Sequence, residues 1–533
     1  MGNRLSITLP LTLSIILISI CVSSVCGEND GEYDDGDDPI MFEVGDFCFY
    51  TITKSSVDLY EVYESEVEDL EIPASVEYEG IRYDVIQISS QIGGENIKTV
   101  HIPASIMIMT GGIFSAPNLE WITVDEDNLF FTSVDGILYD KDMHVILAYP
   151  QKKTDESFVF PETITTVGEG AFYNSCVKRI YMPEGMKEIE YFAFSGCKDL
   201  ESINNIGVAN MLPESISIID RGAFDECSNL TNLKLPDQLK LLGDGAFANS
   251  GLTKINIPEE VQSIGSYVFS NCEDLETITS DNYAYIVEDN ILYYKGRTLT
   301  VVAYPAACER TELVLDAQVT DIMPKAFSGC KYLQKIVLPK SMADIPEDAF
   351  RQCYSLTEID LTNVSVLEYG VFHSCSSLKN VTWGDQLTTI GLLSFQGTAI
   401  EEIELPSSVR VLGSGAFSGC NNLISFTIPE TSRVSLESDV FYDCNNLTEI
   451  TIYSSDVSFE YGSLDIASVD NPATLTLNVN KDLTIPDDVV SDYSETTLVI
   501  KVIGERPYPY ENIIGVIICL LIVVSILRMF RGI

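Results

Sequence analysis

The sequence predicts a β-rich solenoid of short stacked coils, followed by one C-terminal transmembrane helix. Three observations predict it: a phenylalanine that recurs at a nearly constant spacing, an apolar-rich composition, and an uncharged stretch near the C-terminus. The chain has 533 residues, of which 46% are hydrophobic, and a formal net charge of −49. Such an apolar content indicates a folded chain. So acidic a chain argues against a nucleic-acid binder, which needs a clustered basic surface.

Residues 1–27 are expected to be a cleaved signal peptide. Arg4 gives a positive start, an apolar run follows from Leu9 to Val22, and Val25-Cys26-Gly27 ends in small residues suited to cleavage. The first residues also match the N-myristoylation pattern, but the apolar run behind them favours export. Residues 28–41, rich in acids and glycines, are expected to form a flexible leader.

The solenoid prediction for residues 42–455 comes from an internal repeat with most steps at 22 to 24 residues. The repeated phenylalanines are Phe114, Phe172, Phe194, Phe224, Phe247, Phe269, Phe327, Phe350, Phe372, Phe395, Phe417 and Phe441. A full unit reads Ala326-Phe327-Ser328-Gly329-Cys330-x-x-Leu333-x-x-Ile336-x-Leu338-Pro339. Its Leu-x-x-Ile-x-Leu stretch predicts a short strand that the proline ends. One coil cannot bury its own apolar face, whereas stacked coils bury a continuous one.

Two intervals depart from this spacing in the same way. The steps from Phe114 to Phe172 and from Phe269 to Phe327 are each 58 residues long. Both contain Ile-Leu-Tyr, at Ile137 and Ile291, and later an Ala-Tyr-Pro triplet. The repetition predicts two duplicated hairpin-like inserts within the solenoid.

The C-terminal region is expected to end the solenoid and anchor it. Residues 456–508 keep the alternation typical of strands and are interpreted as a β-rich cap and stalk. Residues 509–527 are expected to be a transmembrane helix, because Ile513 to Leu527 carries no charge and tyrosines precede it. Residues 528–533 would then form a short basic cytoplasmic tail. A removed lipid-anchor signal is the alternative.

The cysteines are predicted to be buried free thiols. Eight of them lie three residues after a repeat phenylalanine: Cys197, Cys227, Cys272, Cys330, Cys353, Cys375, Cys420 and Cys444. Ser250 and Thr398 take this place in other coils, which indicates a position for small side chains. Bridging between neighbouring coils stays an alternative.

The repeats resemble the BspA-like (bacterial surface antigen A-like) leucine-rich repeat family. The Ala-Phe-x-x-Cys-x-x-Leu-x-x-Ile-x-Leu-Pro unit carries the resemblance, with the insert Asp135-Gly136-Ile137-Leu138-Tyr139 and the entry segment Phe49-Tyr50-x-Ile52. The resemblance implies a right-handed leucine-rich repeat solenoid on a cell surface, used for adhesion to host proteins or to other cells. It implies no catalytic residue and no cofactor.

Two sets of candidate site residues follow from the coil pattern. The residue after the coil proline is acidic in five coils, which predicts a weak divalent-cation column of Glu162, Glu184, Glu214, Asp237 and Glu259. Side chains between the buried strand positions point outward, and solenoids bind on such faces. A cationic ligand-binding patch is predicted there, with Lys178, Arg179, Tyr181, Lys234, Lys254 and Asn256. A salt-bridged, unused face is the alternative.

The sequence therefore predicts a single-pass plasma-membrane protein with its N-terminal ectodomain outside the cell. The expected partner is an extracellular protein or glycan, captured by an adhesin. A structural coat protein that assembles through its solenoid is the alternative, and the oligomeric state stays open. An enzyme is not expected, because the three histidines lie far apart and no catalytic motif occurs.

Overall fold

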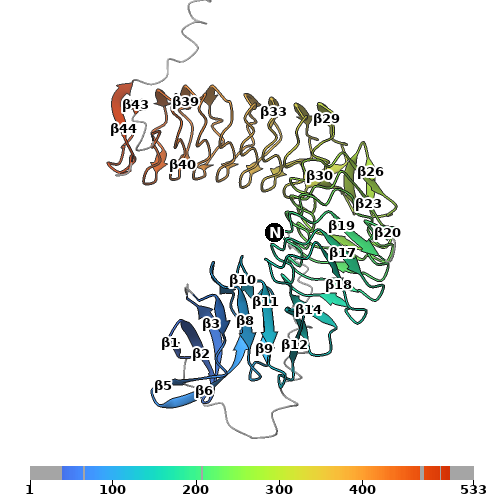
Figure 1. The fold of residues 1–533 in the computed structure, drawn as a ribbon. Helices are drawn as coiled ribbons and strands as arrows, with labels where there is room; N and C mark the ends of the chain where they lie inside the picture. Colours follow the sequence, from blue (N-terminus) through green and yellow to red (C-terminus); the bar gives the residue numbers. More distant parts are fainter. Residues whose placement is uncertain (1–38, 64–66, 206–207, 468–472, 492–493, 504–533) are drawn as a thin grey trace, which may run out of the picture.

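The computed structural model describes residues 39–63, 67–205, 208–467, 473–491 and 494–503. Within these ranges the chain forms strands and turns and no α-helix. The coils follow an open arc in Figure 1, from β1 (Met41–Val44) at the lower left, through β18 (Glu188–Ile189), to β44 (Thr496–Ile503) at the upper left. The predicted solenoid is confirmed.

One side of the solenoid is a ladder of parallel strands, which we call the long-strand face. Its strands are in register, so that Arg179 lies opposite Ser202 of the next coil. Every second side chain is buried, because strand side chains alternate in direction and the Leu-x-x-Ile-x-Leu pattern turns its apolar residues inward. The strands are β4 (Asp69–Glu71), β8 (Thr99–Ile102), β11 (Trp121–Val124), β15 (Ser157–Val159), β17 (Arg179–Met182), β19 (Ser202–Asn205), β23 (Lys254–Ile257), β25 (Thr277–Ser280), β29 (Glu312–Val314), β31 (Lys335–Val337), β33 (Glu358–Asp360), β35 (Asn380–Thr382), β37 (Glu402–Glu404), β39 (Ser425–Ile428), β41 (Glu449–Ile452), β43 (Ala473–Asn480) and β44.

A second ladder of shorter strands runs beside the first. In the upper arm of Figure 1, labels of the long-strand face lie along the upper edge and β40 lies along the lower edge. The short strands also pair in parallel, because each coil repeats the one before it. They are β16 (Thr166–Val167), β18, β21 (Ile218–Ile219), β22 (Leu241–Leu242), β24 (Ser263–Ile264), β30 (Val319–Ile322), β32 (Asp344–Ile345), β34 (Val366–Leu367), β36 (Thr389–Ile390), β38 (Val411–Leu412), β40 (Val434–Leu436) and β42 (Val457–Phe459).

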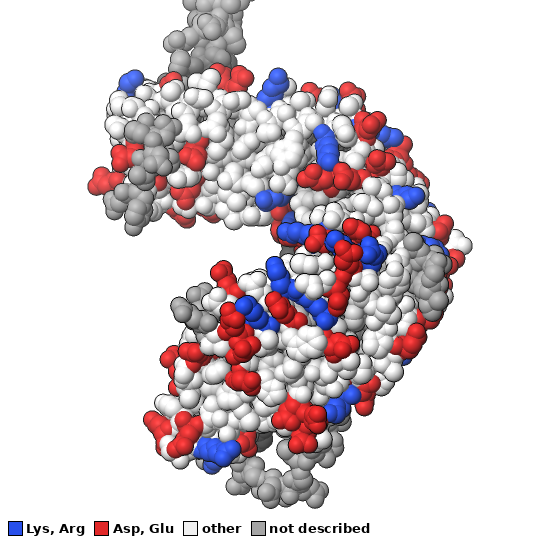
Figure 2. All heavy atoms as spheres, viewed as in Figure 1, with Lys and Arg blue, Asp and Glu red and all other residues white. Residues whose placement is uncertain are grey.

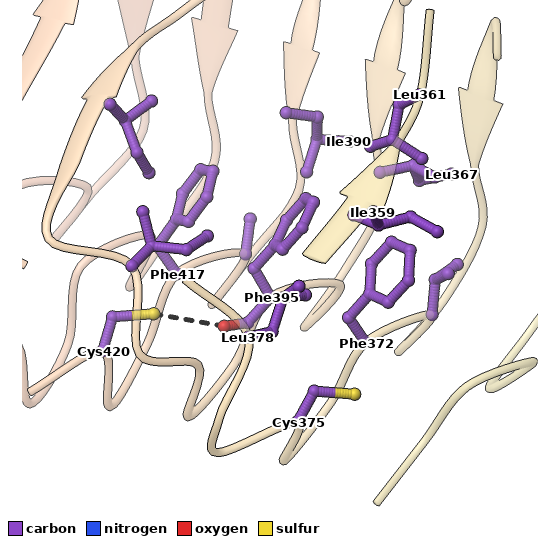
Figure 3. Close-up of a cluster of buried hydrophobic side chains, with 14 of the residues drawn as sticks. Ile359, Leu361, Leu367, Phe372, Cys375, Leu378, Ile390, Phe395, Phe417 and Cys420 are labelled. Atoms are coloured by element: carbon purple, nitrogen blue, oxygen red, sulfur yellow. Dashed lines mark hydrogen bonds between the residues drawn. The ribbon is translucent and has the colours of Figure 1, made fainter. Parts of the chain in front are cut away.

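The third side consists of turns, which we call the turn face, and it contains the repeat phenylalanines. Their rings stack from coil to coil with centroids 4.9 to 6.3 Å apart, first from Phe172 to Phe269 and then from Phe327 to Phe441. Figure 3 shows three of these rings, Phe372, Phe395 and Phe417, beside buried isoleucines and leucines of the coils. The phenylalanine N–H also donates to the next coil, as from Phe372 to the Ser394 carbonyl at 2.7 Å. Each turn is therefore held by packing and by hydrogen bonds to its neighbour.

The cysteine column lies beside the phenylalanines. Seven of the eight thiols donate to the carbonyl oxygen of a repeat phenylalanine in the preceding coil at 2.9 to 3.2 Å, as Cys420 does to Phe395 in Figure 3. All eight are buried, and none of the described cysteines forms a disulfide. Burial raises the pKa of Cys272 to about 11, so its thiol stays protonated. The predicted buried free thiols are confirmed.

The two inserts divide the core into three blocks. Each is a set of antiparallel strands, β12 (Phe131–Val134), β13 (Ile137–Asp140) and β14 (Val145–Ala148) in the first, and β26 (Tyr285–Glu288), β27 (Ile291–Lys295) and β28 (Leu299–Ala303) in the second. Along β13, Leu138 packs into the N-terminal block, while Ile137 and Tyr139 pack into the middle one. The predicted hairpin-like inserts are confirmed, and their strands serve as walls between blocks.

The N-terminal end carries additional strands. β1 to β3 and β6, with β2 (Phe47–Thr53), β3 (Ser56–Val62) and β6 (Ile81–Ile88), form one sheet, to which β5 (Ser75–Tyr78) and β9 (Ile108–Met109) add. β7 (Ile92–Gly93) pairs with β10 (Phe114–Ser115) in the same region. Further along the chain, β20 (Val208–Ala209) pairs with β19. The antiparallel strands of the six-stranded sheet lie at the N-terminal end of the arc (Figure 1).

The C-terminal strands continue the long-strand face. β43 and β44 pair in parallel over eight residues each. Both strands lie within residues 456–508, for which the cap and stalk stays a prediction. No helix within the described ranges is long and apolar enough to cross a membrane. The predicted signal peptide, the predicted transmembrane helix at 509–527 and the tail lie outside the described residues.

Candidate ligand-binding face

The outward positions of the long-strand face lie where the sequence placed them. Arg179 and Tyr181 alternate with buried residues on β17, and Lys254 and Asn256 do so on β23. Tyr181 is 38% exposed and stands in register between Val159 and Asn204 of the neighbouring strands. Tyr181 and Val159 together form an exposed apolar surface on this part of the face, because Val159 is also largely exposed.

The first two predicted cations share one partner. Lys178 and Arg179 approach the carboxylate of Glu156, from the coil before, at 3.5 and 3.1 Å. The positive charges of Lys178 and Arg179 hold the pKa of Glu156 below its usual range. Two positive charges and one negative charge leave this group cationic, with exposed side chains.

The other cations lie further along the solenoid and differ from each other. Lys234 reaches Glu214 at 3.5 Å and Asp237 at 3.9 Å, so it lies between two acids of the predicted cation column. Lys254 makes no ion pair with a described residue, and Asn256 donates to Asp281 at 2.8 Å. On the face that Figure 2 shows, most basic side chains lie beside acidic ones.

An extra hairpin separates the two groups of predicted residues. The step from Phe194 to Phe224 is 30 residues long, and it contains β19 and β20. Met211 then pairs with Lys234, and Asn232 pairs with Lys254. The six residues therefore form two patches on one face: Lys178, Arg179 and Tyr181 before the hairpin, and Lys234, Lys254 and Asn256 after it.

The long-strand face also contains a hollow that the sequence did not predict. It has a volume of about 360 Å³ and lies over β31, β33 and β35. Its polar lining includes Lys335, which pairs with Glu358, together with Asp360, Asn380 and Thr382. Glu358 and Asp360 lie on either side of the buried Ile359 on β33, as strand alternation requires, but the depth of a surface depends on side chains from several coils.

The predicted cation column is partly occupied by the chain itself. The Asp237 N–H donates to the Glu214 carboxylate at 2.8 Å, and Lys234 contacts both residues. Among the residues that the structure describes, no group of three or more histidine, cysteine or acidic side chains is placed to hold a metal ion. The described acids of the column therefore form no chelating site, and what they offer a divalent cation is their shared negative charge.

A family model agrees with the repeat. The model described as the BspA type leucine rich repeat region (6 copies) matches residues 148–276, 205–310, 297–424 and 362–468. These stretches overlap and cover more than half of the chain. No curated protein matches the sequence.

The chain is similar to several solved structures at low sequence identity, and the first one named here shares its fold. A leucine-rich repeat protein of Eubacterium ventriosum is 21% identical, with a TM-score of 0.54, over 69% of this chain and 97% of its own. A leucine rich cell surface protein of Faecalibacterium prausnitzii is 22% identical, with a TM-score of 0.45, over 78% and 95%. The pneumococcal vaccine antigen PcpA is 17% identical, with a TM-score of 0.38, over 87% and 99%.

Proposed function

Because the chain belongs to the BspA-type leucine-rich repeat family, we propose that it is a cell-surface adhesin that binds a protein or a glycan outside the cell. The observation that supports this proposal is the long-strand face, on which each coil presents outward side chains from a hydrogen-bonded ladder. A rigid surface loses little conformational entropy when it binds. Extended faces of this kind are the surfaces that solenoids use for binding.

The proposed location is the plasma membrane, with the solenoid outside. The signal-peptide pattern at residues 1–27 and the uncharged stretch in residues 509–527 support a single-pass arrangement. Protease added to intact cells should then cleave the solenoid and leave a cytosolic marker uncut. Full protection of the chain in intact cells, with cleavage only after lysis, would contradict this location.

The proposed contact residues are the two cationic patches. Lys178 and Arg179 would exchange part of their contact with Glu156 for an anionic group of the ligand, and Tyr181 would supply an aromatic anchor. Lys254 offers a charge that no described acid pairs. An anionic glycan or an acidic protein surface fits this chemistry. Outward acids of later coils, such as Asp360 on β33 and Glu402 on β37, would repel the ligand and orient it.

A binding screen tests the proposal against the coat alternative. Full-length protein is titrated with extracellular-matrix proteins and glycans, and its sedimentation is measured without ligand. Saturable binding by a monomer supports the adhesin. Concentration-dependent assembly with no ligand supports a coat. We propose no enzymatic activity, and the screen requires none.

A charge-removal variant tests the contact residues. Replacing Lys178, Arg179, Lys234 and Lys254 by Ser should abolish binding of the ligand found in the screen. The melting temperature should change little, because exposed ion pairs contribute little to stability. The control replaces Lys240, Arg297, Lys340 and Lys481, which are exposed and lie elsewhere, and removes the same charge. Undiminished binding by the first variant, or equal loss in the control, would refute the assignment.

A further inference from the structure

The turn face contains a second column, formed by the residue two positions before each repeat phenylalanine. All its members have positive φ. They are Gly112, Gly170, Phe192, Gly222, Gly245, Tyr267, Lys325, Asp348, Gly370, Leu393, Gly415 and Asp439. We call this the left-handed column. Consecutive members are neighbours in space. Apart from Tyr267, the N–H of each member donates to the carbonyl just before the next, as from Gly170 to Tyr191 at 2.9 Å.

Two aromatic members of this column cover glycines of adjacent coils. A Cβ atom on Gly222 would lie 2.4 Å from the ring of Phe192, and one on Gly245 would lie 2.9 Å from the ring of Tyr267. Lys325, the next column member, places its Nζ 5.3 Å from the centre of the Tyr267 ring. This distance is within the range of a cation–π contact. The column thus already binds an ammonium group over one of its two aromatic rings.

The other ring, Phe192, borders a hollow of about 400 Å³. The two column members before it, Gly112 and Gly170, have no side chains to fill this space. They are adjacent although 58 residues apart in the sequence, because the first insert brings residues 89–113 against residues 169–195. Phe192 is 37% exposed, and no lysine or arginine of the described chain stands over its ring.

The polar lining of this hollow is acidic. Glu169, Asp225 and Glu226 line it with Tyr173. Glu226 pairs with Lys198 at 3.1 Å, and Asp225 accepts from Asn249 at 2.8 Å. Burial and the nearby Asp220 raise the pKa of Glu169, and burial raises the pKa of Asp225. A positive group in the hollow would stabilise the ionised form of both carboxylates. An aromatic wall with acids around it is suited to an organic cation.

We infer that this hollow binds the ammonium group of a lysine side chain in a basic segment of a partner protein. The site lies on the turn face and goes beyond the proposed function, which uses the long-strand face. Its chemistry is that of Lys325 on Tyr267, repeated at a ring that the chain leaves open. The large negative charge of the molecule would bring such a segment to the surface.

The test measures the binding of a fluorescent hexalysine peptide to the full-length protein by anisotropy at low salt. The same peptide with acetylated side chains should not bind, because it has lost its charges. Phe192→Leu should weaken hexalysine binding about fivefold, since it removes the ring and keeps an apolar group. Leucine suits this backbone, because Leu393 holds the same column position at a φ of 56°.

A second pair of variants separates a site from general attraction. Glu169→Gln with Glu226→Gln should weaken hexalysine binding about tenfold by removing two charges at the hollow. Glu401→Gln with Glu402→Gln removes the same charge from the exposed long-strand face and should weaken it less than twofold. The quadruple Lys/Arg→Ser variant above should bind hexalysine normally, so failure of the adhesin proposal would remain distinguishable.

Three outcomes would overturn the inference. They are equal weakening by the two double variants, full affinity in Phe192→Leu, and equal binding of the acetylated peptide. If Phe192→Leu lowers the melting temperature strongly, the comparison of the two double variants decides alone, because neither changes a packed ring.

Discussion

At the residue scale, the space for each buried side chain of a coil is set by the coils on either side of it. Phe350 packs between Phe327 and Phe372, with ring centroids 5.1 and 5.6 Å away. The cysteine slot is similarly narrow: Thr398 occupies it in one coil and contacts the Cys420 sulfur of the next at 3.3 Å. A small side chain able to bond with its neighbour is therefore what this position requires.

Phe350→Ala should lower the free energy of unfolding by about 3–5 kcal/mol, because it leaves a cavity in the ring stack. Urea unfolding of the full-length chain measures the loss. Tyr283→Ala is the control, since Tyr283 is 82% exposed, and its effect should stay within about 0.5 kcal/mol. A loss below about 1 kcal/mol for Phe350→Ala would show that the stack contributes little.

The thiols should differ in reactivity according to burial. Iodoacetamide should modify the exposed Cys176 in the native protein, and it should modify the eight column thiols only after unfolding. Mass spectrometry of tryptic peptides identifies the modified sites. Dithiothreitol should leave the melting temperature unchanged, because no disulfide links the described coils. Rapid native labelling of Cys375 or Cys420 would contradict the buried column.

Glu190 should make stability depend on pH. Burial and the neighbouring Glu188 raise its pKa to about 7, above the usual value of about 4.3 in an unfolded chain. The protonated side chain therefore stabilises the fold below about pH 4, and this contribution is lost as the pH rises through about 7. Glu190→Gln should raise the free energy of unfolding by about 1–3 kcal/mol at pH 8, and the gain should disappear near pH 4.

The control for this prediction is Glu260→Gln, because Glu260 is exposed. Urea unfolding at pH 8 and pH 4 compares both variants with the unchanged protein. The glutamine side chain of the Glu190→Gln variant can still accept the hydrogen bond that the Glu169 N–H donates to Glu190 at 3.1 Å. Equal stabilisation by Glu190→Gln at both pH values would rule out the carboxyl group as the cause.

At the element scale, the turns have a backbone requirement that the strands lack. From Phe172 onward, each repeat turn has two left-handed residues, two positions before and two positions after the phenylalanine, as at Gly370 and Ser374. Glycine adopts this conformation without strain, and asparagine or aspartate does so more readily than other residues. This requirement explains why glycine, asparagine and aspartate recur beside the phenylalanine in the sequence.

Gly222→Ala should be strongly destabilising, because the residue has a φ of 60° and its Cβ would lie 2.4 Å from the Phe192 ring. We expect a loss of about 2 kcal/mol or more. Two controls separate the causes in thermal unfolding. Gly80→Ala tests the positive φ alone, since nothing lies within 4 Å of its Cβ. Gly185→Ala is the baseline, because Gly185 has neither a positive φ nor an atom within 4 Å of its Cβ. Equal losses for Gly222→Ala and Gly80→Ala would exclude the ring contact.

At the scale of the whole molecule, the inserts divide the hydrophobic core of the solenoid into three blocks along the arc. The chain nevertheless carries a net charge of −49 over this extended shape. Repulsion between the acidic side chains destabilises the folded state along the whole solenoid. Ion pairs such as Lys234 with Glu214 relieve it only locally.

Calcium should therefore stabilise the molecule weakly through the acids that follow the coil prolines. Millimolar calcium should raise the melting temperature by about 2 °C more than sodium chloride of equal ionic strength. Replacing Glu162, Glu184 and Glu259 by Gln should remove the difference, because it takes three of the five negative charges from the column. If both salts raise the melting temperature equally, the acids of the column are merely solvated and the prediction is wrong.

The sequence by itself determined the solenoid, the two inserts and the direction of each strand side chain. These features depend on spacing along the chain: a 22- to 24-residue step sets the coil, and alternation turns Arg179 and Tyr181 outward. The small residues after the phenylalanines also predicted the buried thiols, because a narrow slot limits side-chain size in every coil.

Only the tertiary structure decided which side chains meet across coils. It paired Lys178 with Glu156, separated the predicted cationic residues by the hairpin of β19 and β20, and placed Gly112 against Gly170 beside Phe192. Such contacts depend on the lengths of inserts and on side-chain reach, and neither enters the repeat pattern. The physical reason is that periodicity sets the backbone register, whereas charge pairing and hollows depend on the particular residues that the register brings together.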